Sequence, residues 1–410
     1  MRRLPSLRSP PAAPVDRSDL MAPRSPPSGR ARRAPDASGT GALPPDVMFE
    51  VLLHLPVKDL CRFRAVSRAW RSLTSDPLFA TAHAARHTGP LFLARFRDDK
   101  THVCIVDLSG KVVKRIAGAA SSHCEQLLCT RLNLACLTTD WNRCRVLSPA
   151  TGAVRVLPQS PAAEHVNKVN LRDPCTLFAL GWIASTGEYK VLRMFSRVDF
   201  AFGRQQLFEV LTLNGGADRA RWRGSRSPGL LVEKCGGGGV VVDGVVYLLT
   251  SRAYDRVRHG IRPDYIISFD LRTEEWRKDL QGPLSGNIRS YKRSELTLAE
   301  LKGSLALAHH SHIPSSITDI WFLVDFENGR WVKEYHIQTG SIVTRAAGEH
   351  HLIPLLVLDD GRLVVYLSPR RLLLICDPGT STFTKVDISH LDSIGLYTGN
   401  LLSLEEDVVL

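Results

Sequence analysis

A strand–turn–strand unit recurs along the second half of the chain, and this repeat limits the possible folds more than any other feature. Valine-rich runs flank Asp243-Gly244, a dipeptide typical of a two-residue β-hairpin turn. We predict the same turn geometry at Lys302-Gly303 and at Asp360-Gly361, which places the three glycines 59 and 58 residues apart. A repeat of this length predicts one supersecondary unit stacked on copies of itself.

Each copy also contains an aspartate that ends a strand-like run, with an aromatic residue six positions later. The three pairs are Asp270 with Trp276, Asp325 with Trp331, and Asp377 with Phe383. Aspartate can start an Asx turn, and the aromatic would then fill the core from the returning strand.

Fainter copies of this unit stand earlier in the chain, at 146–149 returning at Val154 and at 105–107 returning at Val113. Four strand-like pieces per unit are typical of a β-propeller blade of the kelch type. The repeat therefore predicts an all-β propeller of about six kelch-like blades over residues 90–405.

Residues 43–87 have a helical period instead, which predicts a small all-α module of three or four short helices. Pro45 and Asp46 suit a first helical turn, and Pro56 would end that helix. Asp76-Pro77 is an N-cap followed by proline at the first helical position. A module of this size needs a staple or a partner to close its core. Its remaining apolar side chains would be buried either against another protein or against the propeller, and the residues favour neither.

The net charge of +12 makes nucleic acid a partner class to weigh. Residues 1–42 hold eight Arg and three Asp with eight of the 24 prolines and no aromatic residue, which predicts a disordered basic leader. The remaining residues carry only +7. A nucleic-acid-binding protein that uses this leader and the Arg-rich stretch 219–226 stays open as an alternative, although the spacing of apolar residues in 43–70 favours a protein partner.

The sequence lacks the residue patterns that several functional classes require. The nine cysteines form no C-x-x-C pair, which favours reduced thiols in the nucleus and/or the cytoplasm. No apolar run approaches the ~18 residues of a membrane span.

The glycine run 236–239 is not followed by Gly-Lys-Ser/Thr, so a P-loop is not supported. His309, His310 and His312 have no carboxylate at ligand spacing. We therefore predict no catalytic residue, no metal and no cofactor; a propeller enzyme or lectin would need convergent polar ligands in a central channel.

The helical segment has a residue pattern that is specific over more than 40 positions. It reads Leu43-Pro44-x-Asp46, then Glu50-Val51-Leu52-x-x-Leu55-Pro56-Val57-Lys58, then Arg62-Phe63-Arg64-x-Val66-Ser67-x-x-Trp70, and then Asp76-Pro77-x-Phe79. This pattern resembles an F-box of the plant type.

The repeat region has its best family match between residues 181 and 192. The match reads Gly181-Trp182-x-x-Ser185-Thr186-Gly187-Glu188-Tyr189-Lys190-Val191-Leu192. It resembles the F-box-associated domain of plant F-box proteins, which usually has Asp and Pro where this chain has Ile183 and Ala184.

The resemblance implies three parts: a leader over 1–42, an F-box over 43–87, and an F-box-associated propeller over 90–405 that recruits a substrate. It implies a non-catalytic receptor subunit of an SCF-type ubiquitin ligase, bound to a Skp-family adaptor and through it to a cullin scaffold. Neither the protein substrate nor the residues that bind it can be named, and neither nucleic acid nor a membrane is expected as a partner. An adaptor-bound F-box protein without a degradation role stays open.

The same resemblance assigns the adaptor-binding surface by position. Ten residues are expected to form or support it, with Leu60 and Trp70 as candidates for the internal core: Leu43, Pro44, Val47, Leu52, Leu55, Pro56, Val57, Leu60, Val66 and Trp70.

Overall fold

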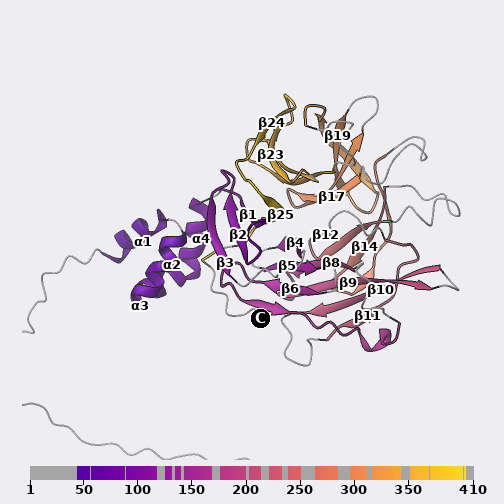
Figure 1. Ribbon diagram of the computed structural model, residues 1–410, viewed down its shortest axis with the longest axis horizontal. Helices are drawn as coiled ribbons and strands as arrows, with labels where there is room; N and C mark the ends of the chain where they lie inside the picture. Colours follow the sequence, from indigo (N-terminus) through magenta and orange to yellow (C-terminus); the bar gives the residue numbers. More distant parts are fainter. Residues whose placement is uncertain are drawn as a thin grey trace, which may run out of the picture. The chain divides into compact units, whose positions relative to one another are not determined.

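The computed structural model (Figure 1) describes residues 44–402 with short gaps. The gaps are 56, 88, 118–124, 132–133, 140–142, 169–175, 200–202, 214–220, 233–238, 251–263, 285–295, 312–315, 343–350, 369 and 400. The expected leader over 1–42, together with Leu43, Pro56, His312 and the residues after 402, lies outside the described residues.

Four short helices form the first part of the described chain, and we call them the helical module. They are α1 (Pro45–Leu53), α2 (Val57–Val66), α3 (Arg68–Ser75) and α4 (Pro77–Arg86). The predicted cap of α4 is confirmed, because the Asp76 carboxylate accepts a hydrogen bond from Leu78 N at 2.8 Å and Pro77 opens the helix. Ser67 occupies the N-cap position of α3 but makes no side-chain cap hydrogen bond.

All later elements are strands, apart from one 3-10 turn, η1 (Ala163–His165). The strands are β1 (Leu91–Phe96), β2 (His102–Asp107), β3 (Val112–Ala117), β4 (Glu125–Arg131), β5 (Leu134–Thr139), β6 (Cys144–Leu147), β7 (Val154–Val156), β8 (Thr176–Ile183), β9 (Glu188–Asp199), β10 (Gly203–Thr212), β11 (Arg223–Ser225), β12 (Val240–Val242), β13 (Val245–Leu249), β14 (Tyr265–Asp270), β15 (Glu275–Trp276), β16 (Leu280–Gln281), β17 (Leu296–Leu301), β18 (Ser304–Ser311), β19 (Ile317–Asp325), β20 (Arg330–Gln338), β21 (His351–Val357), β22 (Leu363–Ser368), β23 (Leu372–Asp377), β24 (Thr382–Lys385) and β25 (Leu391–Tyr397).

These strands form six antiparallel sheets, which are the blades of a propeller. Blade 1 has the order β25-β1-β2-β3, and blades 2, 3, 5 and 6 are β4–β7, β8–β11, β17–β20 and β21–β24. Blade 4 is β12–β15, with β16 as an additional strand on β14. The innermost strands contact one another in sequence, from β25 through β4, β8, β12 and β17 to β21, and β21 contacts β25 again. The prediction of about six blades is confirmed.

Blade 1 closes the ring with strands from both ends of the propeller. Figure 1 shows β25, in yellow, beside β1, in purple, and the two strands pair from Leu91 with Tyr397 to Phe96 with Leu391. The propeller is therefore completed only when its last strand joins its first.

The core lies between the blades. Each of six apolar clusters takes its buried residues mainly from two neighbouring blades, including the pair formed by blade 6 and blade 1. Neighbouring blades cover both faces of inner strands such as β2, which is a continuous buried run, whereas outer strands such as β20 and β24 are largely exposed.

Two of the three predicted hairpin turns have the expected geometry. Asp243 and Gly244 have φ of 47° and 75°, and Lys302 and Gly303 have 52° and 74°, as a two-residue turn with two left-handed residues requires. The third prediction is wrong in detail. Val357 pairs with Leu363, so the connection at Gly361 is longer, and only that glycine has a positive φ there.

The predicted aspartate turns are confirmed in the last three blades. The carboxylates of Asp270, Asp325 and Asp377 each accept a hydrogen bond from a backbone N–H two or three residues ahead. The fourth strand then returns, and its aromatic pairs with a third-strand residue: Phe269 with Trp276, Leu323 with Trp331, and Cys376 with Phe383.

The fourth-strand tryptophans also connect neighbouring blades. The indole N–H of Trp276 donates to Arg226 O at 2.6 Å, and that of Trp331 donates to Gln281 O at 2.9 Å. Trp222, which precedes β11 in blade 3, donates to Pro158 O at 2.7 Å. Arg226 follows β11 and Pro158 follows β7, whereas Gln281 lies in β16, so all three acceptors belong to the end of the preceding blade. These tryptophans therefore connect one blade to the next.

Gly110 is the turn glycine at which a side chain should do most damage. It lies between β2 and β3 with φ +87°, and a Cβ atom there would clash with the backbone oxygen of Asp387. We expect Gly110→Ala to lower the free energy of unfolding by about 2–4 kcal/mol, because it adds a backbone clash to the left-handed conformation. Gly303→Ala is the control, since φ is +74° there and nothing lies within 4 Å. Urea unfolding measures both variants, and equal losses would show that the clash at Asp387 is relieved.

Candidate functional site

The helical module has a small core of its own. Leu52, Leu53, Leu60, Phe79 and Ala80 are buried together. Outside this group, Phe49 meets the Phe79 ring edge-on at 5.1 Å, and Phe63 meets Trp70 in the same way at 4.5 Å. The helices thus pack around one apolar centre, in which part of the module's apolar side chains are buried.

Leu402, which follows the last propeller strand, completes this core. It is fully buried among the module's leucines and Phe79. Arg64 of α2 donates to Leu402 O at 2.7 Å and to the Oγ1 atom of Thr74 at 3.1 Å, and it also bonds Thr74 O. Part of the module's apolar surface is therefore covered from within the same chain. This is one of the two alternatives that the sequence left open, burial against the propeller part of the chain rather than against another protein.

A second part of the apolar surface is not covered. Eight large apolar side chains are exposed in the part of the chain that the structure describes, and four of them belong to the helical module. Their exposed fractions are 44% for Val47, 49% for Val51, 77% for Val66 and 77% for Leu78. Val47 and Val51 are four residues apart on α1 and so share one helix face. This concentration on a small module is typical of a protein-docking surface.

The structure separates the ten expected surface residues into three groups. Pro44, Val47 and Val66 are exposed, and Leu55 and Trp70 are half-buried. Leu52 and Leu60 are buried in the module core, so they can support the surface but cannot contact a partner. Leu43 and Pro56 lie outside the described residues, and of Val57 only its position at the start of α2 is described.

Two exposed residues were missed by the sequence reasoning: Val51 and Leu78. Val51 belongs to the matched pattern and lies one turn after Val47, so its helical spacing was a usable signal. Leu78 directly follows the capping Asp76-Pro77 pair, and nothing in its spacing distinguishes it from a core residue.

His83 of α4 and His87, the C-cap residue that follows α4, cap the end of α1. The Nε2–H of His83 donates to Leu55 O at 2.8 Å, and that of His87 donates to Leu53 O at 3.1 Å. These carbonyls lie at or beyond a helix end, where intrahelical partners are lacking. Burial lowers the pKa of His83 from 6.5, and the neighbouring His87 adds to this, although the bond to Leu55 O opposes it.

The helical module should therefore lose stability in acid. Because the folded-state pKa of His83 lies below 6.5, the unfolded chain takes up a proton that the folded chain does not. The contribution of His83 is complete above 6.5 and is lost as the pH falls through the lowered pKa. Hydrogen exchange of α1 and α4 amides at about pH 7 and about pH 5.5 measures this effect. His83→Gln should make the pH dependence smaller; an unchanged dependence would assign it to other groups.

The described residues include no group of three or more His, Cys, Asp or Glu arranged to hold a metal ion. His309 and His310 are buried on β18, and His310 Nδ1 lies 2.8 Å from the Thr318 hydroxyl. Burial raises the pKa of the Cys376 thiol to about 12, with Asp377 adding to the shift, so this thiol is not an activated nucleophile. No helix in the described ranges has the length and apolar character to cross a membrane.

Comparison with known proteins agrees with both halves of this description. The family model of the F-box domain matches residues 42–81, and that of the F-box associated beta propeller domain matches 92–397. F-box/LRR-repeat protein At2g43260 of Arabidopsis thaliana is 26% identical over 345 residues, which cover 80% of this chain and 75% of the relative. F-box/kelch-repeat protein At2g43445 of the same plant is 26% identical over 372 residues, covering 88% and 82%.

Proposed function

The chain belongs to the family of F-box proteins with an F-box associated β-propeller domain, and from this membership we propose that it is a substrate-recognition subunit of an SCF-type ubiquitin ligase. The helical module binds a Skp-family adaptor, which connects the chain to a cullin scaffold. The propeller binds the protein to be modified. The chain acts in the nucleus and/or the cytoplasm.

One observation supports this proposal most directly. Half of the exposed large apolar side chains in the described residues lie on four short helices, while the much larger propeller carries the other half. Val47 and Val51 lie at helical spacing, and among the described residues nothing covers them, so they are suited to a helix-in-groove contact with another protein.

The chain itself supplies no chemistry in this proposal. A receptor accelerates transfer by holding the target beside the conjugating enzyme, which raises the effective concentration of the reacting groups. Such a role needs two binding surfaces and a fixed relation between them. The hydrogen bond from Arg64 to Leu402 O provides one direct connection between the module and the chain that closes the propeller.

Co-expression of the full chain with a Skp-family adaptor tests the proposal. We expect the two to purify as one stable complex and to recruit a cullin. If the adaptor is not retained, the receptor role is wrong. Comparing the bound proteins with and without proteasome inhibition then separates a degradation receptor from an adaptor-bound protein that has no degradation role, since only the former accumulates targets under inhibition.

A further inference from the structure

Blade 3 contains a buried ion pair. Arg193 on β9 and Glu209 on β10 are direct cross-strand neighbours, with exposed fractions of 1% and 0%. The guanidinium donates from Nη2 at 2.6 Å and from Nε at 2.8 Å to the same carboxylate oxygen, Glu209 Oε2. The guanidinium also lies 3.9 Å above the ring of Trp222.

Blades 4 and 6 show that this position does not require charge. The blades can be aligned on the third-strand residue that lies opposite the fourth-strand aromatic. In blade 3 this residue is Leu211, opposite Trp222 when the β10–β11 register is continued, and Glu209 stands two positions before it. The residues two positions before the partners of Trp276 and Phe383 are Ile267 in blade 4 and Leu374 in blade 6.

Their second-strand neighbours are apolar too. Ile267 pairs with Leu248, and Leu374 pairs with Val365, and all four are buried. A buried ion pair seldom exceeds an apolar pair in stability, because both charges lose their hydration. The charges of blade 3 must therefore serve something that blades 4 and 6 do not have.

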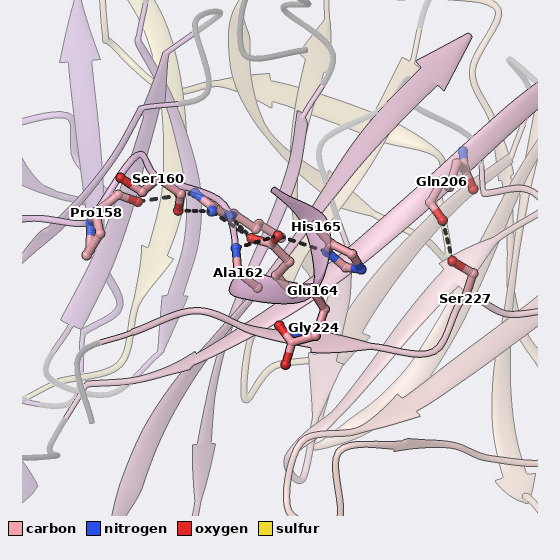
Figure 2. A network of polar contacts seen from close by, with 10 residues as sticks. Pro158, Ser160, Ala162, Glu164, His165, Gln206, Gly224 and Ser227 are labelled. Atoms are coloured by element: carbon pink, nitrogen blue, oxygen red, sulfur yellow. Dashed lines mark hydrogen bonds and ion pairs between the residues drawn. The ribbon is translucent and has the colours of Figure 1, made fainter. Parts of the chain in front are cut away.

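That additional feature is the connection that leads from β7 into blade 3. Figure 2 shows how its backbone is held. Glu209 Oε1 accepts a hydrogen bond from Ala162 N at 2.9 Å and lies 2.9 Å from His165 Nδ1. Arg193 donates to Ser160 O at 2.7 Å and to Pro158 O at 3.2 Å.

A further contact fixes the outer side of the same connection. Glu164 Oε2 accepts a hydrogen bond from Gly224 N at 3.3 Å, which joins η1 to β11 (Figure 2). The connection is thus anchored between Pro158 and His165 by charged side chains, which lowers the ordering entropy that binding would cost.

This frame presents two valines and three basic residues to solvent, together with the Glu164 carboxylate that accepts from Gly224 N. Val166, directly after η1, is 51% exposed, and Val156 at the end of β7 is 60% exposed. Lys168 is exposed on the same connection, and Arg221 and Arg226 are exposed on either side of β11. Among the described residues, none of these three cations has an ion-pair partner. We call these five residues the loop surface.

We propose that the loop surface binds an acidic peptide segment with apolar side chains, within the protein that the propeller recruits. Its carboxylates meet Lys168, Arg221 and Arg226, and its apolar side chains cover the two valines. This inference rests on the proposed recruiting role of the propeller and names the class of segment recruited.

A nucleic acid fits the loop surface less well. Single strands bind through aromatic platforms on which bases stack. The nearby indole of Trp222 is buried, and the Arg193 guanidinium covers its ring. The exposed apolar groups are valines, which offer no flat face to a base.

The test measures binding of a fluorescein-labelled peptide of alternating Glu and Val residues to the full chain, by anisotropy and without adaptor. We expect Arg221→Ser/Arg226→Ser to weaken binding about tenfold or more, and high salt to weaken it as well. Arg330→Ser/Lys385→Ser removes the same charge from exposed positions on β20 and β24 and should leave binding unchanged.

Val166→Asp tests the apolar part, and because Val166 is exposed its replacement leaves the fold intact. It should also weaken peptide binding by about tenfold. Equal binding by the Arg221/Arg226 and Arg330/Lys385 variants, or equal binding of a Lys–Val peptide, would overturn the proposal. Tighter binding of a polyuridine RNA, lost in the Arg221/Arg226 variant, would assign the surface to nucleic acid instead. Failure of adaptor binding is a separate result, since the adaptor is absent here.

Discussion

Val47→Glu/Val51→Glu will bind a Skp-family adaptor at least about a hundredfold more weakly than the unaltered chain, a loss of about 2.7 kcal/mol. Both valines are about half exposed and lie one turn apart on α1, so the two glutamates place charge on a single face. In an apolar interface each carboxylate would lose its hydration without gaining a partner. The free chain should remain folded, because neither side chain belongs to the module core and glutamate favours a helix.

The matched control lies on the propeller. Val324 and Val332 are 48% and 43% exposed on β19 and β20 of blade 5, so Val324→Glu/Val332→Glu makes the same chemical change at the same degree of exposure. Calorimetric titration of both full-length variants with purified adaptor gives the comparison. If the α1 variant binds as well as the blade 5 variant, the α1 face does not contact the adaptor.

Val47 and Val51 test the expected adaptor-binding surface better than Leu55, which is one of the ten residues assigned to that surface from the family resemblance. Leu55 is half-buried, and its carbonyl accepts the hydrogen bond from His83. A charge at Leu55 would therefore disturb the capping of α1 as well as any adaptor contact. Loss of binding in such a variant could not be separated from loss of fold.

Removing one charge of the Arg193–Glu209 pair should destabilise the protein far more than removing both. Glu209→Ile leaves a guanidinium buried without its carboxylate, and Arg193→Leu leaves the carboxylate, each at a loss of about 3–5 kcal/mol. Arg193→Leu/Glu209→Ile reproduces the Leu248–Ile267 pair of blade 4. We expect its free energy of unfolding to lie within about 1 kcal/mol of the unaltered chain.

Urea unfolding of the four proteins forms a double-mutant cycle, whose coupling term measures the pair directly. Hydrogen exchange gives the second readout. The double variant should retain protection in β9 and β10 but lose it at residues 157–168, because Ala162 N no longer has the Glu209 carboxylate as an acceptor. If the double variant is as unstable as either single variant, blade 3 needs the charges for its own packing.

The propeller could be predicted because its signals are local. A two-residue turn needs left-handed backbone at Gly244 and Gly303, and an Asx turn needs Asp270 or Asp325 at the strand end, whatever the rest of the chain does. The turn at Gly361 was misjudged since the number of residues in a loop depends on which strand residues pair. The pairing of β25 with β1 joins residues about three hundred positions apart and has no local signal.

The candidate surfaces were only partly predictable for a related reason. Leu52 and Val51 are adjacent in an F-box pattern, yet one is buried and the other exposed, and only the packing of four helices with Leu402 decides which. The blade 3 pair did leave a trace in the sequence. Arg193 and Glu209 each interrupt an apolar strand-like run, and alignment of the repeats sets them against leucine, isoleucine and valine.

The burial of Leu402 in the helical module has a consequence for how the protein is made. The module is synthesised first, but one of its core residues emerges from the ribosome after the last propeller strand. Likewise, β1 cannot form its pairing with β25 until β25 has been synthesised. Neither part can reach its final packing during translation, so a chain that stops short of residue 391 leaves both its helical module and its ring unfinished.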